Sequence, residues 1–213
     1  MIKAVLLDFD GTLVDHDILD VVCGIVGKEA ESVQINRDYH AGTRPGLDAL
    51  VTRINFLKGV SQEQIDAKLQ AAAYLMPGAQ ELMAYLNAHG IMTILNSGNI
   101  LPVLAAYQKM LGITHVVGSE PTMKGDIIQG ITESQFTGPN FKLEGVQKIL
   151  AGTGLQPSET LAIGDSPADK QVFEFAGTSI AIHPKGDIGE FADYVVEDLR
   201  DCIEIIEQLS QGK

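Results

Sequence analysis

The sequence predicts an α/β fold, in which a parallel sheet carries helices on both faces and a small all-helical domain follows the first strand. Three observations lead to this prediction. An apolar strand at Val5 to Leu7 ends in two carboxylates, the stretch 15–76 shows only helical periodicity, and helices alternate with short β-rich runs from Gly78 onward. Such alternation is typical of parallel strands joined by right-handed crossovers. With 213 residues and 45% hydrophobic content, the chain can bury one α/β core and a small second domain.

The segment after the first strand has apolar residues at helical spacing in three stretches and contains no convincing strand. These stretches are Ile18 to Val26, Leu47 to Leu57, and Ile65 through Ala72 to Leu75. We therefore divide the chain into an α/β core of residues 1–14 and 77–213 and a helical cap of residues 15–76. An insertion at this point is expected to lie over the carboxyl end of the first strand as a lid.

The remaining elements follow in alternation, with turn residues between them. We expect helices over 78–89, 101–111, 142–150, 170–176 and 199–209, strands over 91–95, 115–118, 161–164 and 179–182, and a hairpin-like excursion over 127–136 at the sheet edge.

The run Lys3 to Leu13, KAVLLDFDGTL, places Asp8 and Asp10 at the carboxyl end of the first strand, where open α/β sheets bind their ligands. A carboxylate can attack phosphorus and form an aspartyl phosphate, while a second carboxyl moves the proton of the leaving oxygen. Gly11 permits a sharp turn, and Thr12 offers a hydroxyl to a phosphate. The run therefore indicates a phosphoryl-transfer site. Taken without the rest of the run, the two aspartates could also be ordinary polar residues at the end of a strand.

Two later runs offer groups that bind an anion. Ser97 and Gly98 lie between a predicted strand and a predicted helix, where a hydroxyl and free amides form an anion site, although an ordinary turn uses the same residues. Lys142 begins a predicted helix, where a cation is unfavourable, which hints at a function. An exposed lysine is the alternative for Lys142, and Lys124 and Lys148 are its competitors.

The run Thr160 to Asp169, TLAIGDSPAD, is a second buried strand followed by two acids, Asp165 and Asp169. Carboxylates from two adjacent strand ends could hold one Mg²⁺, which prefers oxygen ligands. An ordinary acidic loop is the alternative for this run taken alone.

These four runs, in this order, resemble the four motifs of the haloacid-dehalogenase-like superfamily, whose core is a Rossmann-like α/β sheet. The resemblance implies that Asp8 is the nucleophile and Asp10 the general acid and base. It implies that Ser97 and the amide of Gly98 bind the transferring phosphoryl group. It also implies that Lys142 neutralises the phosphate and the nucleophile.

The resemblance further implies one Mg²⁺ as cofactor. Its ligands would be Asp8, the carbonyl of Asp10, and Asp165. Asp169 would be a second acid that orients metal-bound water or the motif lysine.

The string DFDGTLVDHDILD and the tail GTSIAIHPKGDIGEFADYVVED are similar to the phosphoserine phosphatase branch of this superfamily. In that branch a cap acid holds the amino group of the substrate and a cap arginine its carboxylate, which implies these roles for Asp17 and Arg53. An N-cap is the alternative for Asp17, and a solvated helix side chain is the alternative for Arg53. Three positions depart from the branch pattern, namely Asp17 for Glu, Asn99 for Gly and Ala168 for Asn.

Composition limits the partners. The net charge of −13 opposes binding to nucleic acid or to anionic membranes. No apolar run reaches the roughly 18 to 20 residues that cross a bilayer, and no signal-peptide pattern is present. The two cysteines, Cys23 and Cys202, lie far apart in apolar surroundings and suit a reducing compartment. We expect a cytoplasmic protein with a small-molecule phosphoester as its partner.

The sequence therefore predicts a Mg²⁺-dependent phosphomonoesterase that forms an aspartyl phosphate and acts on a small metabolite such as phosphoserine. A phosphatase or phosphomutase for another small phosphoester, and a noncatalytic phosphate-binding regulator, are the alternatives. Dehalogenation has no need of Asp10, and a P-type ATPase would require membrane helices. A phosphoprotein phosphatase is disfavoured because a sizeable cap restricts the site to small molecules.

Overall fold

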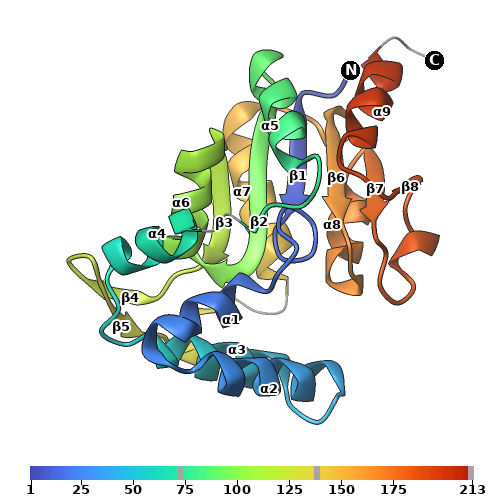
Figure 1. Cartoon of the computed structure of the whole chain (residues 1–213). Helices are drawn as coiled ribbons and strands as arrows, with labels where there is room; N and C mark the ends of the chain where they lie inside the picture. Colours follow the sequence, from blue (N-terminus) through green and yellow to red (C-terminus); the bar gives the residue numbers. More distant parts are fainter. Residues whose placement is uncertain (72–73, 137–139, 211–213) are drawn as a thin grey trace.

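The computed structural model describes residues 1–71, 74–136 and 140–210 (Figure 1). Its main feature is a six-stranded parallel sheet with the strand order β3-β2-β1-β6-β7-β8. The strands are β1 (Ala4–Asp8), β2 (Met92–Ile100), β3 (His115–Ser119), β6 (Thr160–Gly164), β7 (Thr178–Ile182) and β8 (Tyr194–Val196). A separate antiparallel hairpin consists of β4 (Thr122–Lys124) and β5 (Ile127–Gly130). The predicted α/β fold is confirmed.

Helices cover both faces of this sheet. Along β1, Val5 and Leu7 belong to one apolar cluster, and Ala4 and Leu6 belong to a second one. The first cluster includes α5 (Ala79–Ala88), α6 (Leu101–Leu111) and α9 (Asp201–Ser210), and the second includes α7 (Phe141–Thr153) and α8 (Lys170–Phe175). Because all five residues of β1 are buried, the strand reads as a continuous apolar run that ends in a carboxylate.

Four helices follow β1: α1 (Ile18–Cys23), α2 (Glu29–His40), α3 (Gly46–Phe56) and α4 (Gln62–Ala71). Figure 1 shows α1, α2 and α3 as a layer beyond the carboxyl ends of the strands. The chain segments that enter and leave this layer pair with each other, since Asp15 N–H donates to Tyr74 C=O at 3.0 Å and Met76 N–H donates to Leu13 C=O at 3.0 Å.

The hairpin β4-β5 packs on the same helical layer. Ile128 exchanges backbone hydrogen bonds with the α3–α4 loop, donating to Val60 C=O at 2.9 Å and accepting from Gly59 N–H at 2.8 Å. The two ends of the Asn55 amide bond to the backbone of Ile131, at 3.0 and 3.1 Å. The hairpin therefore joins the helices of residues 15–76 although it lies far from them in the sequence.

Several element boundaries differ from the prediction. The strand predicted to end at Leu95 continues to Ile100 because residues up to Ile100 keep pairing with β3 across an irregularity. The third cap helix ends at Ala71; Ala72 lies outside the described residues, and Leu75 forms a β-bridge with Val14 instead of continuing a helix.

The hairpin begins at Thr122 rather than Ile127, and 133–135 is a 3-10 turn rather than part of the hairpin. All three residues of β4 are exposed, so no apolar alternation marks that strand. The short edge strand β8 was not predicted. In the described part of the chain, no helix is both long and apolar enough to cross a membrane.

Candidate active site

Parallel pairing brings three predicted motifs to one edge of the sheet. Asp8, the last residue of β1, is in register with Asn96 of β2, and Leu7 is in register with Ile163 of β6. Ser97 and Asp165 therefore follow directly after residues that lie beside the end of β1. Both side chains are buried, with 2% and 1% of their residue surface exposed.

Lys142 joins two of the acids. Its Nζ donates to Asp8 Oδ1 at 2.6 Å and to Asp169 Oδ1 at 3.1 Å. Burial lowers the pKa of Lys142, but the carboxylates of Asp169 and Asp8 outweigh burial and the net pKa is raised. The lysine therefore stays charged. Its two competitors, Lys124 and Lys148, are exposed.

Three buried acids could hold a metal ion. Asp8, Asp165 and Asp169 each offer a carboxylate oxygen, and these oxygens lie within 4.8 Å of one another. Asp165 is buried, and its Oδ2 lies 2.5 Å from the ammonium of Lys185. A hard divalent cation suits a set of carboxylate oxygens, and the residues fit such an ion. We call Asp8, Asp165, Asp169 and the two lysines that contact them, Lys142 and Lys185, the catalytic cluster.

Gly11 allows Asp165 to approach the first motif. Its φ is +93°, and a Cβ at this position would lie 2.1 Å from Asp165 Oδ2. The glycine thus meets two demands, the turn after the acids and the space for a carboxylate from the neighbouring strand.

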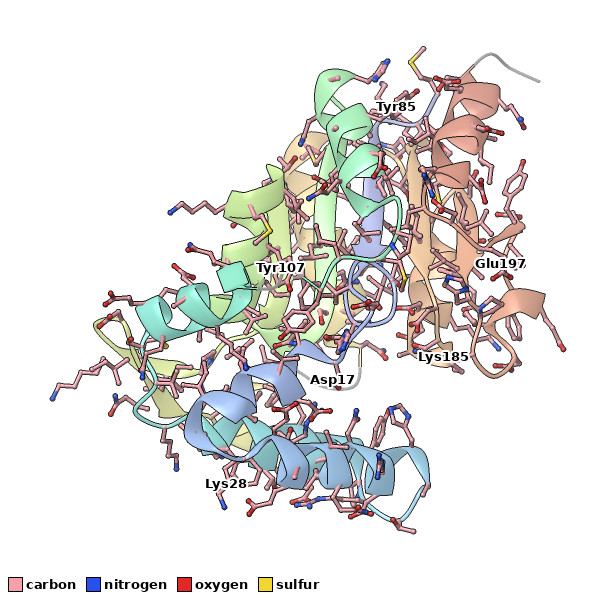
Figure 2. All side chains as sticks on the ribbon, viewed as in Figure 1. Asp17, Lys28, Tyr85, Tyr107, Lys185 and Glu197 are labelled. Carbon is pink, nitrogen blue, oxygen red and sulfur yellow. The ribbon has the colours of Figure 1, made fainter. Side chains whose placement is uncertain are left out.

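Lys185 is a member of the catalytic cluster that the sequence analysis missed. Its Nζ lies 2.5 Å from Asp165 Oδ2, in an ion pair without hydrogen-bond geometry, and its backbone N–H donates to Asp165 C=O at 2.7 Å. Its side chain is 64% exposed, in the loop after β7 (Figure 2). A lysine in a polar loop carries no local signal of such a contact.

Burial raises the pKa of several of these acids. Burial and the neighbouring Asp169 carboxylate raise the pKa of Asp8 to about 7, with Lys142 opposing the shift. Burial also raises the pKa of Asp165, and Lys185 opposes this shift. Crowded carboxylates in a buried site favour protonation unless cations neutralise them.

Asp10 has different partners from Asp8. Its Oδ1 accepts a hydrogen bond from Ile18 N–H at 2.8 Å, and its Oδ2 accepts one from the Ser97 hydroxyl at 3.3 Å. The Asn99 amide also donates to Asp10. All of these donors are neutral. Burial and the Asp17 carboxylate raise the pKa of Asp10 to about 8, against the bonds from Ile18 and Asn99.

The remaining phosphate-binding candidates lie nearby. A Cβ at Gly98 would meet only Leu50 Cδ2 of α3, at 4.0 Å, so this backbone faces open space beneath the cap helices. Thr12 is completely buried, and its hydroxyl has no hydrogen-bond partner among the described residues. The structure corrects one expectation. Residues 97–99 end strand β2 rather than lie at a helix N-terminus, and the Asn99 N–H donates to Ser97 Oγ at 3.0 Å.

The two cap candidates contact each other. Arg53 Nη2 lies 2.5 Å from Asp17 Oδ1 and 2.9 Å from Asp20 Oδ1, and its Nε donates to Ser32 Oγ at 2.9 Å. Ser32 Oγ in turn donates to Asp20 Oδ1 at 2.5 Å. We call Asp17, Asp20, Ser32 and Arg53 the cap cluster.

The structure bears on the alternatives considered for Asp17, an N-cap, and for Arg53, a solvated helix side chain. Asp17 is indeed the N-cap of α1, because its Oδ1 accepts from Asp20 N–H at 3.1 Å, and it lies where the chain enters that helix (Figure 2). Arg53 is not a solvated side chain, since only 6% of its surface is exposed. Burial lowers the pKa of Arg53, but Asp17 and Asp20 outweigh burial and raise it. The sequence analysis missed Asp20, although an acid one turn beyond an N-cap was a local hint.

One family model and several known proteins match the sequence of this chain. The family model described as haloacid dehalogenase-like hydrolase matches residues 5–174. The chain is 30% identical over 208 residues to a phosphoserine phosphatase of Campylobacter jejuni subsp. doylei, covering 97% of this chain and 100% of the relative. It is 28% identical to a phosphoserine phosphatase of Methanocaldococcus jannaschii, covering 96% and 97% of the two chains.

Solved structures give the same result. A substrate-bound phosphoserine phosphatase complex matches with a TM-score of 0.81 at 26% identity, over 96% of this chain and 98% of the other. A phospho-aspartyl intermediate analogue of phosphoserine phosphatase matches with a TM-score of 0.80 at 27% identity, again over 96% and 98%.

Proposed function

This chain belongs to the haloacid dehalogenase-like hydrolase family, and we propose that it is a Mg²⁺-dependent phosphomonoesterase that hydrolyses a small phosphoester such as phosphoserine. The observation that carries the proposal is the contrast between the two acids at the end of β1. Asp8 contacts a charged lysine, whereas the donors to Asp10 are neutral. Such a contrast lets one acid act as an anion and the other as a proton donor.

In the first half of the reaction, an Asp8 carboxylate oxygen attacks phosphorus and the bond to the leaving oxygen breaks. Asp10 gives its proton to that leaving oxygen, and the alcohol departs. Lys142 neutralises the nucleophile and the phosphoryl oxygens, and Ser97 and the Gly98 amide orient the phosphoryl group. A Mg²⁺ held by Asp8, Asp165 and the Asp10 carbonyl would add positive charge where negative charge develops.

In the second half, the Asp10 carboxylate takes a proton from a water molecule whose oxygen attacks the aspartyl phosphate. The bond between phosphorus and Asp8 breaks, which releases inorganic phosphate and restores both carboxyl groups to their starting forms. Asp169 keeps Lys142 in place through the 3.1 Å contact. Thr12 is a further candidate for contact with the phosphate, since its buried hydroxyl has no partner among the described residues.

We also propose that residues 15–76 form a cap over a core of residues 1–14 and 77–213. The paired segments at Asp15 and Tyr74 and at Leu13 and Met76 support this division. Helix α3 supports it too, because Leu50 faces the open side of Gly98.

Within the cap, we assign the substrate contacts to Asp17 and Arg53. The two groups form an ion pair at 2.5 Å in the structure. A zwitterion such as the serine part of phosphoserine could replace that pair, with its ammonium at Asp17 and its carboxylate at Arg53. The guanidinium fork suits a carboxylate. A cytoplasmic location, and the lack of nucleic-acid and membrane partners, stay predictions from the sequence.

A screen of small phosphomonoesters tests the proposal. Phosphoserine, phosphothreonine, an alkyl phosphate without charges and an aryl phosphate are incubated with the protein in Mg²⁺ or in EDTA, and inorganic phosphate is measured. We expect release from at least one ester in Mg²⁺ and none in EDTA. Release that continues unchanged in EDTA, or no release from any ester, would contradict the proposal.

A further inference from the structure

Asn99 brings an amide into contact with the second acid of the site. The side chain is buried, and its Nδ2 lies 3.3 Å from Asp10 Oδ2 and 3.4 Å from Asp10 Oδ1. At its other end, Asn99 Oδ1 accepts a hydrogen bond from Ile100 N–H at 2.9 Å. That bond fixes which end of the amide is the oxygen, so the group facing Asp10 is the NH₂ donor.

The other partners of Asp10 distinguish its two oxygens. Oδ1 accepts the 2.8 Å hydrogen bond from Ile18 N–H, and a backbone amide can only donate. Oδ2 has only longer contacts, from Ser97 Oγ and Asn99 Nδ2 at 3.3 Å each, so the hydrogen of a protonated Asp10 fits better on Oδ2 than on Oδ1. Oδ2 faces the Ser97 hydroxyl, the group assigned above to the phosphoryl oxygens.

The Asn99 amide contacts both oxygens of the Asp10 carboxyl. Because it contacts both oxygens at nearly equal distance, it limits rotation of the Asp10 carboxyl about its Cβ–Cγ bond. The backbone N–H of Asn99 also donates to Ser97 Oγ at 3.0 Å, which directs the Ser97 hydroxyl hydrogen away from Asn99 and toward Asp10 or the phosphate. Asn99 thus contacts both Asp10 and Ser97.

We infer that Asn99 is a positioning residue that holds the Asp10 carboxyl with Oδ2 toward the leaving oxygen of the substrate. This inference rests on the proposed role of Asp10 as the proton donor. Among the described residues, the NH₂ group donates to Asp10 alone, so any effect of this donor on the reaction acts through the Asp10 carboxyl.

The test uses the demand of the leaving group for a proton. An alkyl phosphate needs Asp10 to protonate a poor leaving group, whereas a dinitrophenyl phosphate expels a stable anion without help. In Asn99→Leu, which keeps the size and removes the donor, we expect kcat/KM to fall about tenfold or more for the alkyl ester. For the dinitrophenyl ester we expect it to stay within about twofold of the starting protein.

Two further variants complete the design. Asn55→Leu removes another amide, one whose two hydrogen bonds go to the backbone of Ile131, and should leave the ratio of the two kcat/KM values unchanged. If Asn99→Leu does not fold, as judged by circular dichroism and thermal unfolding, Asn99→Ala replaces it in every comparison.

A double-mutant cycle with Asp10→Asn separates positioning from a general structural effect. When Asp10 is already Asn, Asn99→Leu should cause no further loss on the alkyl ester. An equal loss in both backgrounds, or an equal loss on both esters, would overturn the inference.

The same cycle distinguishes failure of the inference from failure of the proposed function. If Asp10→Asn lowers kcat/KM selectively for the alkyl ester but Asn99→Leu does not, only the inference about Asn99 is wrong. If Asp10→Asn itself spares the alkyl ester, Asp10 is not the proton donor, and both the inference and that part of the proposed function are wrong.

Discussion

The catalytic cluster and the cap cluster each contain one more acid than cations, but they differ in how closely their acids are gathered around one point. In the cap cluster, the guanidinium of Arg53 bonds to Asp17, Asp20 and Ser32, and its donors are well used. In the catalytic cluster, three carboxylates offer oxygens within 4.8 Å of one another, and Lys142 and Lys185 contact them. Three acids against two lysines, and two acids against one arginine, leave the same formal excess of one negative charge, but in the catalytic cluster the excess lies among three closely spaced carboxylates.

Under the proposed function, this difference separates the groups that stabilise the helices of residues 15–76 from the groups that perform the chemistry. The groups of the cap cluster contribute to folding, and a substrate can bind one of them only by replacing the partner that it contacts in the structure. The closely spaced carboxylates of the catalytic cluster favour any ligand that brings positive charge. The predictions below therefore expect losses of activity from changes in the catalytic cluster and losses of stability from changes in the cap cluster.

The largest expected effect is that of Asp8→Asn. An amide cannot attack phosphorus and is a weaker metal ligand, so phosphate release should fall by at least about 10⁴-fold. The fold should persist, because Lys142 keeps its contact with Asp169. Activity near the level of the unsubstituted protein, in a sample shown to be folded by circular dichroism, would refute the assignment of the nucleophile.

A smaller effect is expected for Gly11→Ala. The added Cβ would lie 2.1 Å from Asp165 Oδ2, so the carboxylate must move and activity should fall by roughly 100-fold, the scale of a displacement near 1 Å. Gly42→Ala is the control, because Gly42 also has a positive φ of +70° but has open space around it. Equal activity losses in the two variants would mean that backbone strain, and not the clash with Asp165, is responsible.

Arg53→Ala should act mainly on stability. Removing the guanidinium leaves Asp20 buried and Asp17 partly buried without their cation, and losing one partner of a buried ion pair typically costs about 3 to 5 kcal/mol of unfolding free energy. Arg44→Ala, just before helix α3, is the matched control, since its partner Asp48 is half exposed and the loss should stay below about 1 kcal/mol. Urea denaturation followed by circular dichroism measures both values, and similar values for the two variants would contradict the distinction.

The same variant tests the substrate contact. If Arg53 leaves Asp17 and Asp20 to bind the carboxylate of the substrate, Arg53→Ala should lower kcat/KM roughly tenfold to a hundredfold for phosphoserine. For a small aryl phosphate, kcat/KM should change little. A parallel loss on both esters would indicate that Arg53 supports the cap and does not contact the substrate.

The last expected effect is the pH dependence of the metal-free protein. The pKa values of Asp8 and Asp10 are raised in the folded state to about 7 and about 8, from 3.8. Their contribution to stability is therefore fully present below pH 3.8 and is lost as the pH rises through 7 to 8. In EDTA, Tm should fall between pH 5 and pH 8 by roughly 3 °C per pH unit for each proton concerned. Mg²⁺ should restore Tm at pH 8. A Tm that rises between pH 5 and pH 8 in EDTA would contradict the claim that burial and crowding raise the pKa values of these acids.

The sequence alone predicted the parts of the fold that have a periodic apolar pattern. Strand β1 and helix α6 were predicted because their buried residues recur at strand or helix spacing. Helix α2 has only Ser32 and Ile35 buried, and edge strand β8 has two exposed residues of three, so neither shows such a pattern. Helix α2 and strand β8 form because of tertiary packing, which the local sequence pattern does not encode.

The same limit applies to the site. Asp8, Asp10 and Asp165 lie directly at strand ends, where the chain order of the motifs indicates that they meet. Lys185 reaches Asp165 from a loop after β7, and the Asn99 amide faces Asp10 because β2 continues past its predicted end. Side-chain direction within a locally irregular strand depends on pairing with neighbouring strands, which no local pattern of residues reveals.

The most direct test of the central claim is to locate the phosphoryl group during turnover. The protein is mixed with phosphoserine and Mg²⁺ and quenched in acid after one turnover time, and borohydride then reduces any aspartyl phosphate to homoserine before peptide mass spectrometry. We expect homoserine at position 8 and at no other aspartate, and none when the substrate is omitted. Release of phosphate with no modified aspartate, or modification at Asp10, Asp165 or Asp169 instead, would show that the catalytic cluster does not pass the phosphoryl group through Asp8.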